Sequence, residues 1–126
     1  MMRLLLDTQI VYWTYYEIGR LPQRARQLMT DADSVYVSSA SIWEIAIKSR
    51  LGKIQADPLV MVEKIKGSGF QELAVLYAHA LEVANLPLHH ADPFDRLLVA
   101  QAIRERLSLL TTDARLPQYS NLVIRV

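Results

Sequence analysis

The chain has 126 residues, of which 52% are hydrophobic, and its formal net charge is +1. This length suits one globular domain with a substantial core, so residues 1–126 are expected to form a single domain. The absence of cysteine excludes disulfide bonds and thiolate metal sites. No apolar run approaches the roughly 18 residues of a membrane span, and the opening "MMRLLLD" is too short for a signal peptide, so we expect a cytoplasmic protein. A net charge near zero neither supports nor excludes a nucleic-acid partner.

Short apolar or β-branched runs recur along the chain, and segments with helical periodicity lie between them. Such runs, bounded by polar residues, are typical of buried strands. The expected strands cover residues 2–6, 34–37, 70–75, 107–113 and 122–126. The expected helices follow Thr8, cover 20–33, run from a polar turn at Ser38–Ser41 to Gly52, cover 57–67 and 77–87, and begin at Pro93. Strands that alternate with helices indicate an α/β fold with a mainly parallel sheet covered on both faces.

Four carboxylates occupy positions that this fold brings to one edge of the sheet. Asp7 directly follows the first expected strand, and Asp113 directly follows the apolar run "LLTT" at the end of the fourth. Glu44 lies one turn into the helix after the second strand, and Asp95 lies one turn into the helix from Pro93. Ligands of an open parallel sheet bind beyond the carboxyl ends of its strands, near the point where the strand order reverses. We therefore expect these acids to meet at one rim.

Each acid taken alone also has a structural explanation. Asp92 before Pro93 is typical of a helix start, because Asp caps the free amides and Pro lacks a donor that would have no partner. Asp95 would face the positive end of the helix dipole. The stretch "SIWE", from Ser41 to Glu44, fits a capping box, and the two strand-end acids fit turn or helix caps. Each acid taken alone is therefore consistent with either a capping role or a catalytic role.

The acids considered together favour a metal site. Several carboxylates at one rim repel one another and raise each other's pKa unless a cation neutralises them. A cluster of oxygen ligands suits Mg²⁺ or Mn²⁺ better than zinc. The hydroxyls of Thr8 and Thr112 are candidates to hydrogen-bond the ligands of such a site, and each is equally consistent with an ordinary capping or strand-end residue.

The same stretches resemble a known family. "LLLDT" with Asp7, "SASIWEIAIK" with Glu44, "DPFDRLLVAQA" with Asp92 and Asp95, and "LLTTD" with Asp113 are similar to PIN-domain ribonucleases, in particular VapC-type toxins of toxin–antitoxin pairs. The similarity covers essentially the whole chain and includes "RLGKI" and "ALEVANLPLHHADPFDR". It implies a three-layer α/β/α sandwich and an endoribonuclease that hydrolyses RNA with Mg²⁺, for which Mn²⁺ can substitute.

The resemblance also implies roles for residues and partners. The implied catalytic and metal-binding acids are Asp7, Glu44, Asp95 and Asp113, with Asp92 as an additional metal-binding acid. The implied partners are an RNA substrate, a cognate antitoxin and a second copy of the chain, with the aromatic helix after Asp7 as docking area. Gln9 stands where related sequences often have His, and this difference removes no carboxylate.

Three other interpretations remain. A pair among His79, His89 and His90 would permit metal-free cleavage by acid–base catalysis at the 2′-hydroxyl, although no basic group at suitable spacing supports it. A receiver-like signalling module would need an Asp after the third strand and a Lys after the fourth, and "FQELAV" and "LSLLTTD" supply neither. In a catalytically silent interaction module the acids would only cap, and aromatic side chains such as Trp13 and Trp43 would bind a partner.

Overall fold

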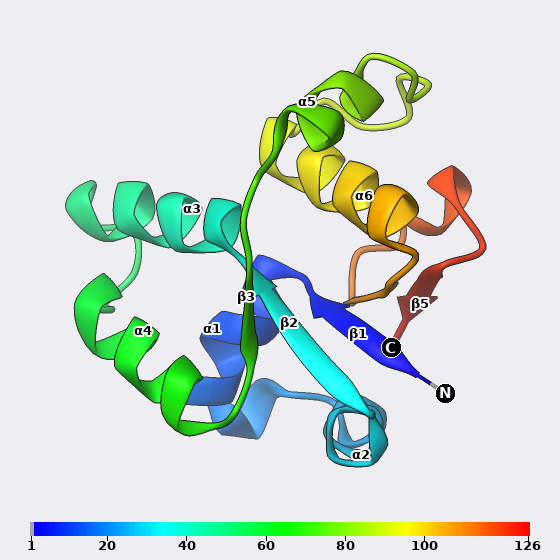
Figure 1. Cartoon of the computed structure of the whole chain (residues 1–126). Coiled ribbons are helices and arrows are strands. Elements are labelled where there is room, and N and C mark those ends of the chain that lie inside the picture. The colour runs from blue at the N-terminus through cyan, green and yellow to red at the C-terminus, as the bar shows by residue number, and fades with distance from the viewer. Residues whose placement is uncertain (1) are drawn as a thin grey trace.

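Five parallel strands form the centre of the molecule in a computed structural model that describes residues 2–126 (Figure 1). The strand order is β3-β2-β1-β4-β5, and every neighbouring pair is parallel. The strands are β1 (Arg3–Leu6), β2 (Ser34–Ser38), β3 (Gln71–Leu73), β4 (Ser108–Thr111) and β5 (Val123–Arg125). The predicted α/β fold is confirmed, and the sheet is wholly parallel in the part that the structure describes.

Helices connect the strands and cover the sheet. They are α1 (Thr8–Tyr16), α2 (Gln23–Asp31), α3 (Ser39–Arg50), α4 (Pro58–Gly67), α5 (Tyr77–Val83) and α6 (Pro93–Glu105), with short 3₁₀ turns at Ile18–Arg20 and Pro117–Tyr119. Among residues 2–126, none of these helices has the length and apolar character needed to cross a membrane.

The alternation of side chains along the strands produces two separate cores. Leu4 and Leu6 of β1 point to the face covered by α1 to α4, where they pack with Ile10, Ile45 and other apolar side chains. Leu5 points to the opposite face, where it packs in a second cluster with residues of α6. Because successive side chains of a strand point to opposite faces, an apolar run such as "RLLL" requires helices on both sides. The predicted three-layer α/β/α arrangement is thus confirmed (Figure 1).

Several element boundaries differ from the sequence-based expectation, among them the shorter α2, β3 and β4, and two of the differences have a clear physical cause. The predicted polar turn at Ser38–Ser41 is wrong, because α3 already begins at Ser39 and the Ser38 hydroxyl caps it by accepting the Ala40 amide at 3.0 Å. The helix expected to reach Pro87 ends at Val83. Beyond it, the Arg96 guanidinium donates to the carbonyl oxygens of Val83, Leu86 and Pro87 at 2.8–3.3 Å. A side chain distant in sequence therefore satisfies carbonyls that a longer helix would have used.

The strand order determines at which edge of the sheet a ligand site is expected. The chain builds outward from β1 through β2 to β3, and then returns to place β4 on the other side of β1. Strands β1 and β4 are therefore the pair at which the order reverses, and their carboxyl ends lead to Asp7 and Asp113. This is the position where open parallel sheets bind ligands.

Candidate active site

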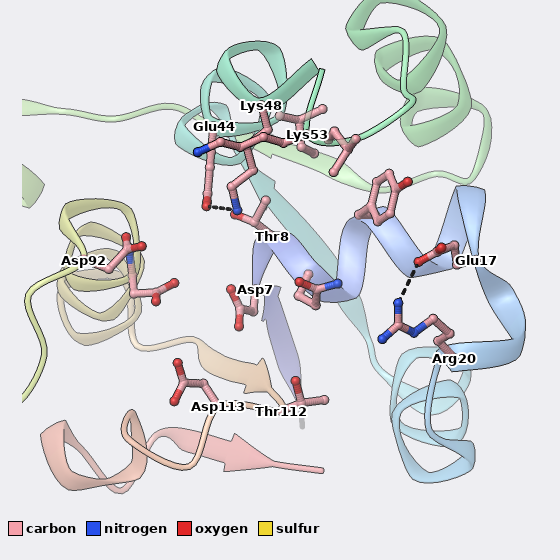
Figure 2. Close-up of a pocket in the computed structure, with 15 residues that line it drawn as sticks. Asp7, Thr8, Glu17, Arg20, Glu44, Lys48, Lys53, Asp92, Thr112 and Asp113 are labelled. Atoms are coloured by element: carbon pink, nitrogen blue, oxygen red, sulfur yellow. Dashed lines mark hydrogen bonds and ion pairs between the residues drawn. The ribbon is translucent and has the colours of Figure 1, made fainter. Parts of the chain in front are cut away.

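One cavity of about 490 Å³ opens at the carboxyl ends of β1 and β4 (Figure 2). Every acid expected at the site from the sequence lines this cavity, from β1, α3, the start of α6 and the turn after β4: Asp7, Glu44, Asp92, Asp95 and Asp113. The fold therefore gathers carboxylates that are up to 106 positions apart in the sequence, from residue 7 to residue 113.

Asp7 is a buried carboxylate that does not act as a cap. It occupies the N-cap position of α1, yet its side chain makes no capping hydrogen bond, so that alternative is wrong. The Thr111 hydroxyl donates to Asp7 Oδ2 at 2.6 Å, and only 6% of Asp7 is exposed. Burial, together with the nearby negative charge of Asp95, raises the pKa of Asp7 to about 7. Among residues 2–126, the main influences on this pKa include no positive charge that would stabilise the ionised form.

Glu44 points into the cavity from α3 with one oxygen unsatisfied. Lys48 Nζ lies 2.9 Å from Glu44 Oε2, whereas the buried Oε1 has no hydrogen-bond partner among residues 2–126. The predicted capping box is wrong, because Ser38 caps α3 and the Ser41 hydroxyl instead accepts a bond from Thr8 Oγ1 at 2.9 Å. A buried carboxylate oxygen without a partner is costly, so this atom indicates a ligand in the cavity.

Asp92 and Asp95 open α6 and have different roles. The Asp92 Oδ1 atom accepts the amides of Phe94 and Asp95 at 2.8 and 3.0 Å, which confirms that Asp92 caps the helix. Asp95 makes no such bond, and His90 Nε2 lies 2.8 Å from its Oδ2 atom. Burial raises the pKa of Asp95, and the hydrogen bond with His90 opposes this effect. Asp95 is therefore a second carboxylate held in the cavity at an energetic cost.

Asp113 combines turn formation with an ion pair. Its Oδ1 accepts the Arg115 amide at 2.8 Å, as in an Asx turn, and Nε of the same arginine at 3.0 Å. Its Oδ2 accepts from Arg115 Nη2 at 2.8 Å. The hydrogen bond from Arg115 is the main reason why the pKa of Asp113 is lowered. A cation bound here would share this carboxylate with an exposed guanidinium.

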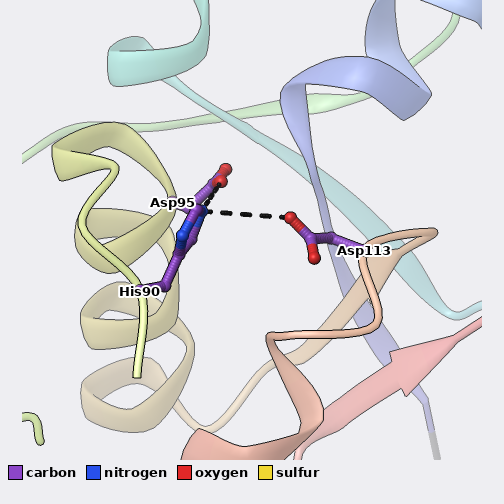
Figure 3. Close-up of side chains that lie close together, drawn as sticks. All are labelled: His90, Asp95 and Asp113. Atoms are coloured by element: carbon purple, nitrogen blue, oxygen red, sulfur yellow. Dashed lines mark hydrogen bonds and ion pairs between the residues drawn. The ribbon is translucent and has the colours of Figure 1, made fainter. Parts of the chain in front are cut away.

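His90 is the residue of the site that the sequence argument undervalued. Its Nε2 atom lies 2.8 Å from Asp95 Oδ2 and 3.9 Å from Asp113 Oδ2, between the loop before α6 and the turn after β4 (Figure 3). The proposed metal-free histidine pair does not form, because His79 is buried against Glu105 and the His89 ring lies against Tyr119. The one available signal was the spacing of "HHADPFD", which sets His90 five positions before Asp95.

The supporting hydroxyl also differs from the one expected. Thr111, rather than Thr8 or Thr112, contacts a carboxylate of the cavity, and its oxygen also accepts the Asp113 amide at 3.0 Å. Thr111 thus links the acid after β1 to the turn after β4. Thr112 lines the cavity, and Thr8 donates to Ser41.

The donor set fits a hard divalent cation. The cavity holds buried carboxylates, one of them with a pKa near 7 and another with an unpartnered oxygen. Mg²⁺ and Mn²⁺ favour oxygen ligands, and their charge would relieve the repulsion that raises these pKa values. In the part of the chain that the structure describes, His90, Asp95 and Asp113 each place a ligand atom within 4.8 Å of the others.

Comparison with known proteins identifies the family. The model of the PIN domain family matches residues 4–122. Ribonuclease VapC22 of Mycobacterium tuberculosis is 33% identical over 122 residues, which cover 92% of this chain and 91% of the relative. The crystal structure of VapBC2 from Rickettsia felis bound to a promoter DNA fragment shares the fold with a TM-score of 0.72 and 16% identity, covering 99% of this chain and 98% of the other. DNA-bound VapBC from Salmonella typhimurium has a TM-score of 0.68 and 17% identity, covering 100% and 98% of the two chains. The chain belongs to the PIN domain family, as the resemblance of its sequence motifs indicated.

Proposed function

We propose that this protein is a Mg²⁺-dependent endoribonuclease, with Mn²⁺ able to replace Mg²⁺, and that it is the toxin of a toxin–antitoxin pair in the cytoplasm. The observation that carries the proposal is the convergence of carboxylates from four elements on one cavity, with Glu44 Oε1 left unpartnered. A silent module whose acids only cap is not favoured, because neither Asp7 nor Glu44 caps a helix. The 33% identity with Ribonuclease VapC22 supports RNA as the substrate.

The acids of the cavity have different roles in binding the cation. Asp7 and Asp95 are the main ligands in this proposal, because Asp7 is buried, Asp95 is half-buried and neither is used as a cap. Asp113 and Glu44 complete the site, and Asp92 caps α6 with one oxygen and leaves the other for the cation. When bound, the divalent ion lowers the pKa of a water and neutralises charge that develops on the phosphate. Thr111 holds Asp7 in place by its hydrogen bond at 2.6 Å.

Basic side chains supply the contacts to RNA. Arg20, Lys48 and Lys53 line the same cavity as the acids. Lysine and arginine attract nucleic-acid phosphates, so these residues are suited to hold the strand on either side of the bond that is cut. Burial lowers the pKa of Lys48, but its hydrogen bond and ion pair with Glu44, together with the charges of Asp92 and Asp95, outweigh this effect and raise the pKa, so the lysine stays charged.

The test is cleavage of RNA by purified protein. We expect cutting of total cellular RNA with Mg²⁺, none in EDTA, and recovery when Mg²⁺ or Mn²⁺ is added back. Asp95→Asn should abolish cutting, whereas Asp57→Asn should not. Asp57 caps α4 and is not among the residues that line the cavity, and Asn caps nearly as well as Asp, so it is a matched control. Full activity in EDTA, or full activity of Asp95→Asn, would contradict the proposal.

We propose an antitoxin and a second copy of the chain as partners. The support is that solved relatives of this fold are toxin–antitoxin complexes, such as those from Rickettsia felis and Klebsiella pneumoniae. The aromatic helix α1, expected as docking area, packs largely against the core. The large exposed apolar side chains lie instead mainly on α3, α4 and α5, among them Trp43, Leu59 and Leu81 at 61–71% exposure. A monomer throughout the micromolar range by sedimentation, with no antitoxin co-purifying from the host, would contradict this assembly.

A further inference from the structure

His90 contacts two acids of the cavity, Asp95 and Asp113. Only 8% of its side chain is exposed, and its Nε2 atom faces Asp95 and Asp113, which come from different elements. A residue that only orients one carboxylate needs a contact with that carboxylate alone. The Nε2 atom lies instead between two carboxylates, where a third ligand of a cation bound by both would be expected.

The spacing of these three atoms is compatible with one coordination sphere. Ligands about 2.1 Å from an octahedral ion lie about 3.0 Å apart when adjacent and about 4.2 Å apart when opposite. The Nε2 atom of His90 lies 2.8 Å from Asp95 Oδ2 and 3.9 Å from Asp113 Oδ2, within or close to this range. The unpartnered Glu44 Oε1, buried in the same cavity, independently indicates a ligand there.

The loop that carries His90 is held in place by contacts outside the acid cluster. The Tyr119 hydroxyl donates to the His90 carbonyl at 3.3 Å. Arg96 donates to the same hydroxyl at 3.3 Å and to the Pro87 carbonyl at 2.8 Å. The backbone that carries the imidazole is therefore held in place before a ligand arrives, and such preorganisation favours a selective metal site.

The geometry points to His90 as a nitrogen ligand of the divalent cation, which makes the site prefer Mn²⁺ over Mg²⁺ in affinity. Imidazole nitrogen is a good ligand for the later transition ions and is accepted by Mn²⁺, whereas Mg²⁺ strongly favours oxygen. This inference rests on the cation of the proposed function and adds the identity of one ligand and the ion it selects.

The experiment measures coordination directly. Mn²⁺ is added to the full-length protein, and electron spin echo envelope modulation detects any ¹⁴N nucleus bound to it. Calorimetric titration then gives the affinities for Mn²⁺ and Mg²⁺. The variants are His90→Gln and, as the matched control, His89→Gln, whose exposed ring touches Tyr119 rather than the acids. Thermal melting checks that both variants fold.

We expect ¹⁴N coupling in the wild type and in His89→Gln, and none in His90→Gln. The affinity for Mn²⁺ should fall about tenfold or more in His90→Gln, the usual loss when a group at a metal site is removed, and the affinity for Mg²⁺ should fall less, so that the ratio of the two affinities decreases. Bound Mn²⁺ without ¹⁴N coupling in the wild type would overturn the inference, because His90 would then only position Asp95. In that case, Mg²⁺-dependent RNA cleavage would leave the proposed function standing. Failure of the wild type to bind either ion would contradict both.

Discussion

Replacing Asp7 by Asn should stabilise the metal-free protein at alkaline pH. The substitution keeps the shape of the side chain and an oxygen that can accept the Thr111 hydroxyl, and it removes a buried negative charge. Burial and Asp95 raise the pKa of Asp7 from 3.8 to about 7, so the ionised form is disfavoured in the folded state. Most substitutions of a buried polar residue destabilise a protein, which makes a gain in stability a discriminating result.

The magnitude follows from the pKa. One unit of pKa corresponds to about 1.4 kcal/mol, so ionisation of Asp7 reduces the free energy of unfolding by about 4 kcal/mol once the pH is above 7. Because the folded state has the higher pKa, this loss develops as the pH rises from 3.8 to about 7 and is constant above that. At pH 5 most of this loss of unfolding free energy has not yet developed. Asn introduces an amide that needs acceptors, so the observed gain at pH 8 should be about 2–4 kcal/mol.

The assay is urea unfolding of the wild type and Asp7→Asn at pH 5 and pH 8 in EDTA. The variant's advantage should be about 3 kcal/mol larger at pH 8 than at pH 5, since about two units of pH separate pH 5 from the pKa of Asp7. Saturating Mg²⁺ should stabilise the wild type and reduce the difference. A variant less stable than the wild type at pH 8, or a difference independent of pH, would refute the argument that Asp7 carries an uncompensated charge.

Three further predictions concern residues that cap, pair with or hydrogen-bond the acids of the cavity. Asp92→Ala should lower the free energy of unfolding by about 1 kcal/mol through loss of the α6 cap, and Asp92→Asn by much less, as measured by urea unfolding. Arg115→Gln should increase the affinity for Mg²⁺ in calorimetric titration, because it removes the guanidinium from Asp113 and frees Oδ2, while Oδ1 keeps its bond from the backbone amide of residue 115; unchanged affinity would place the cation away from Asp113. Thr111→Val should raise the pKa of Asp7 further, because the Thr111 hydrogen bond lowers it; NMR titration of the Asp7 carboxyl carbon would detect an upward shift, and an unchanged value would contradict the role of this hydroxyl.

Local sequence patterns were sufficient to predict much of the fold. The apolar run of β1 and the "DP" start of α6 each contain their own signal, and the structure contains both elements where they were expected. Strand order could then be used to bring Asp7 and Asp113 together, because carboxyl ends of parallel strands share an edge. Sequence reasoning was therefore sufficient to identify the acids of the cavity other than Glu17, which follows α1 and pairs with Arg20.

The parts that were missed depend on contacts between distant segments. Thr111 rather than Thr112 reaches Asp7 because the register pairs Leu6 with Leu110, and the next side chain of β4 then faces Asp7. A shift of one residue would reverse this choice, and a short polar strand end does not specify the register by itself. His90 reaches the acids because Tyr119 and Arg96 fix the loop before α6, and no local pattern in the sequence reports these contacts.

The central claim is that the carboxylates at the carboxyl ends of β1 and β4 act together on one divalent cation. Anomalous diffraction from crystals soaked in Mn²⁺ tests it most directly, because the ion itself is located. The predicted result is a peak in the cavity about 2.2 Å from oxygens of Asp95 and at least one other of the cavity's acids, absent from crystals of Asp95→Asn. An ordered crystal with saturating Mn²⁺ and no peak at this edge of the sheet would contradict the claim.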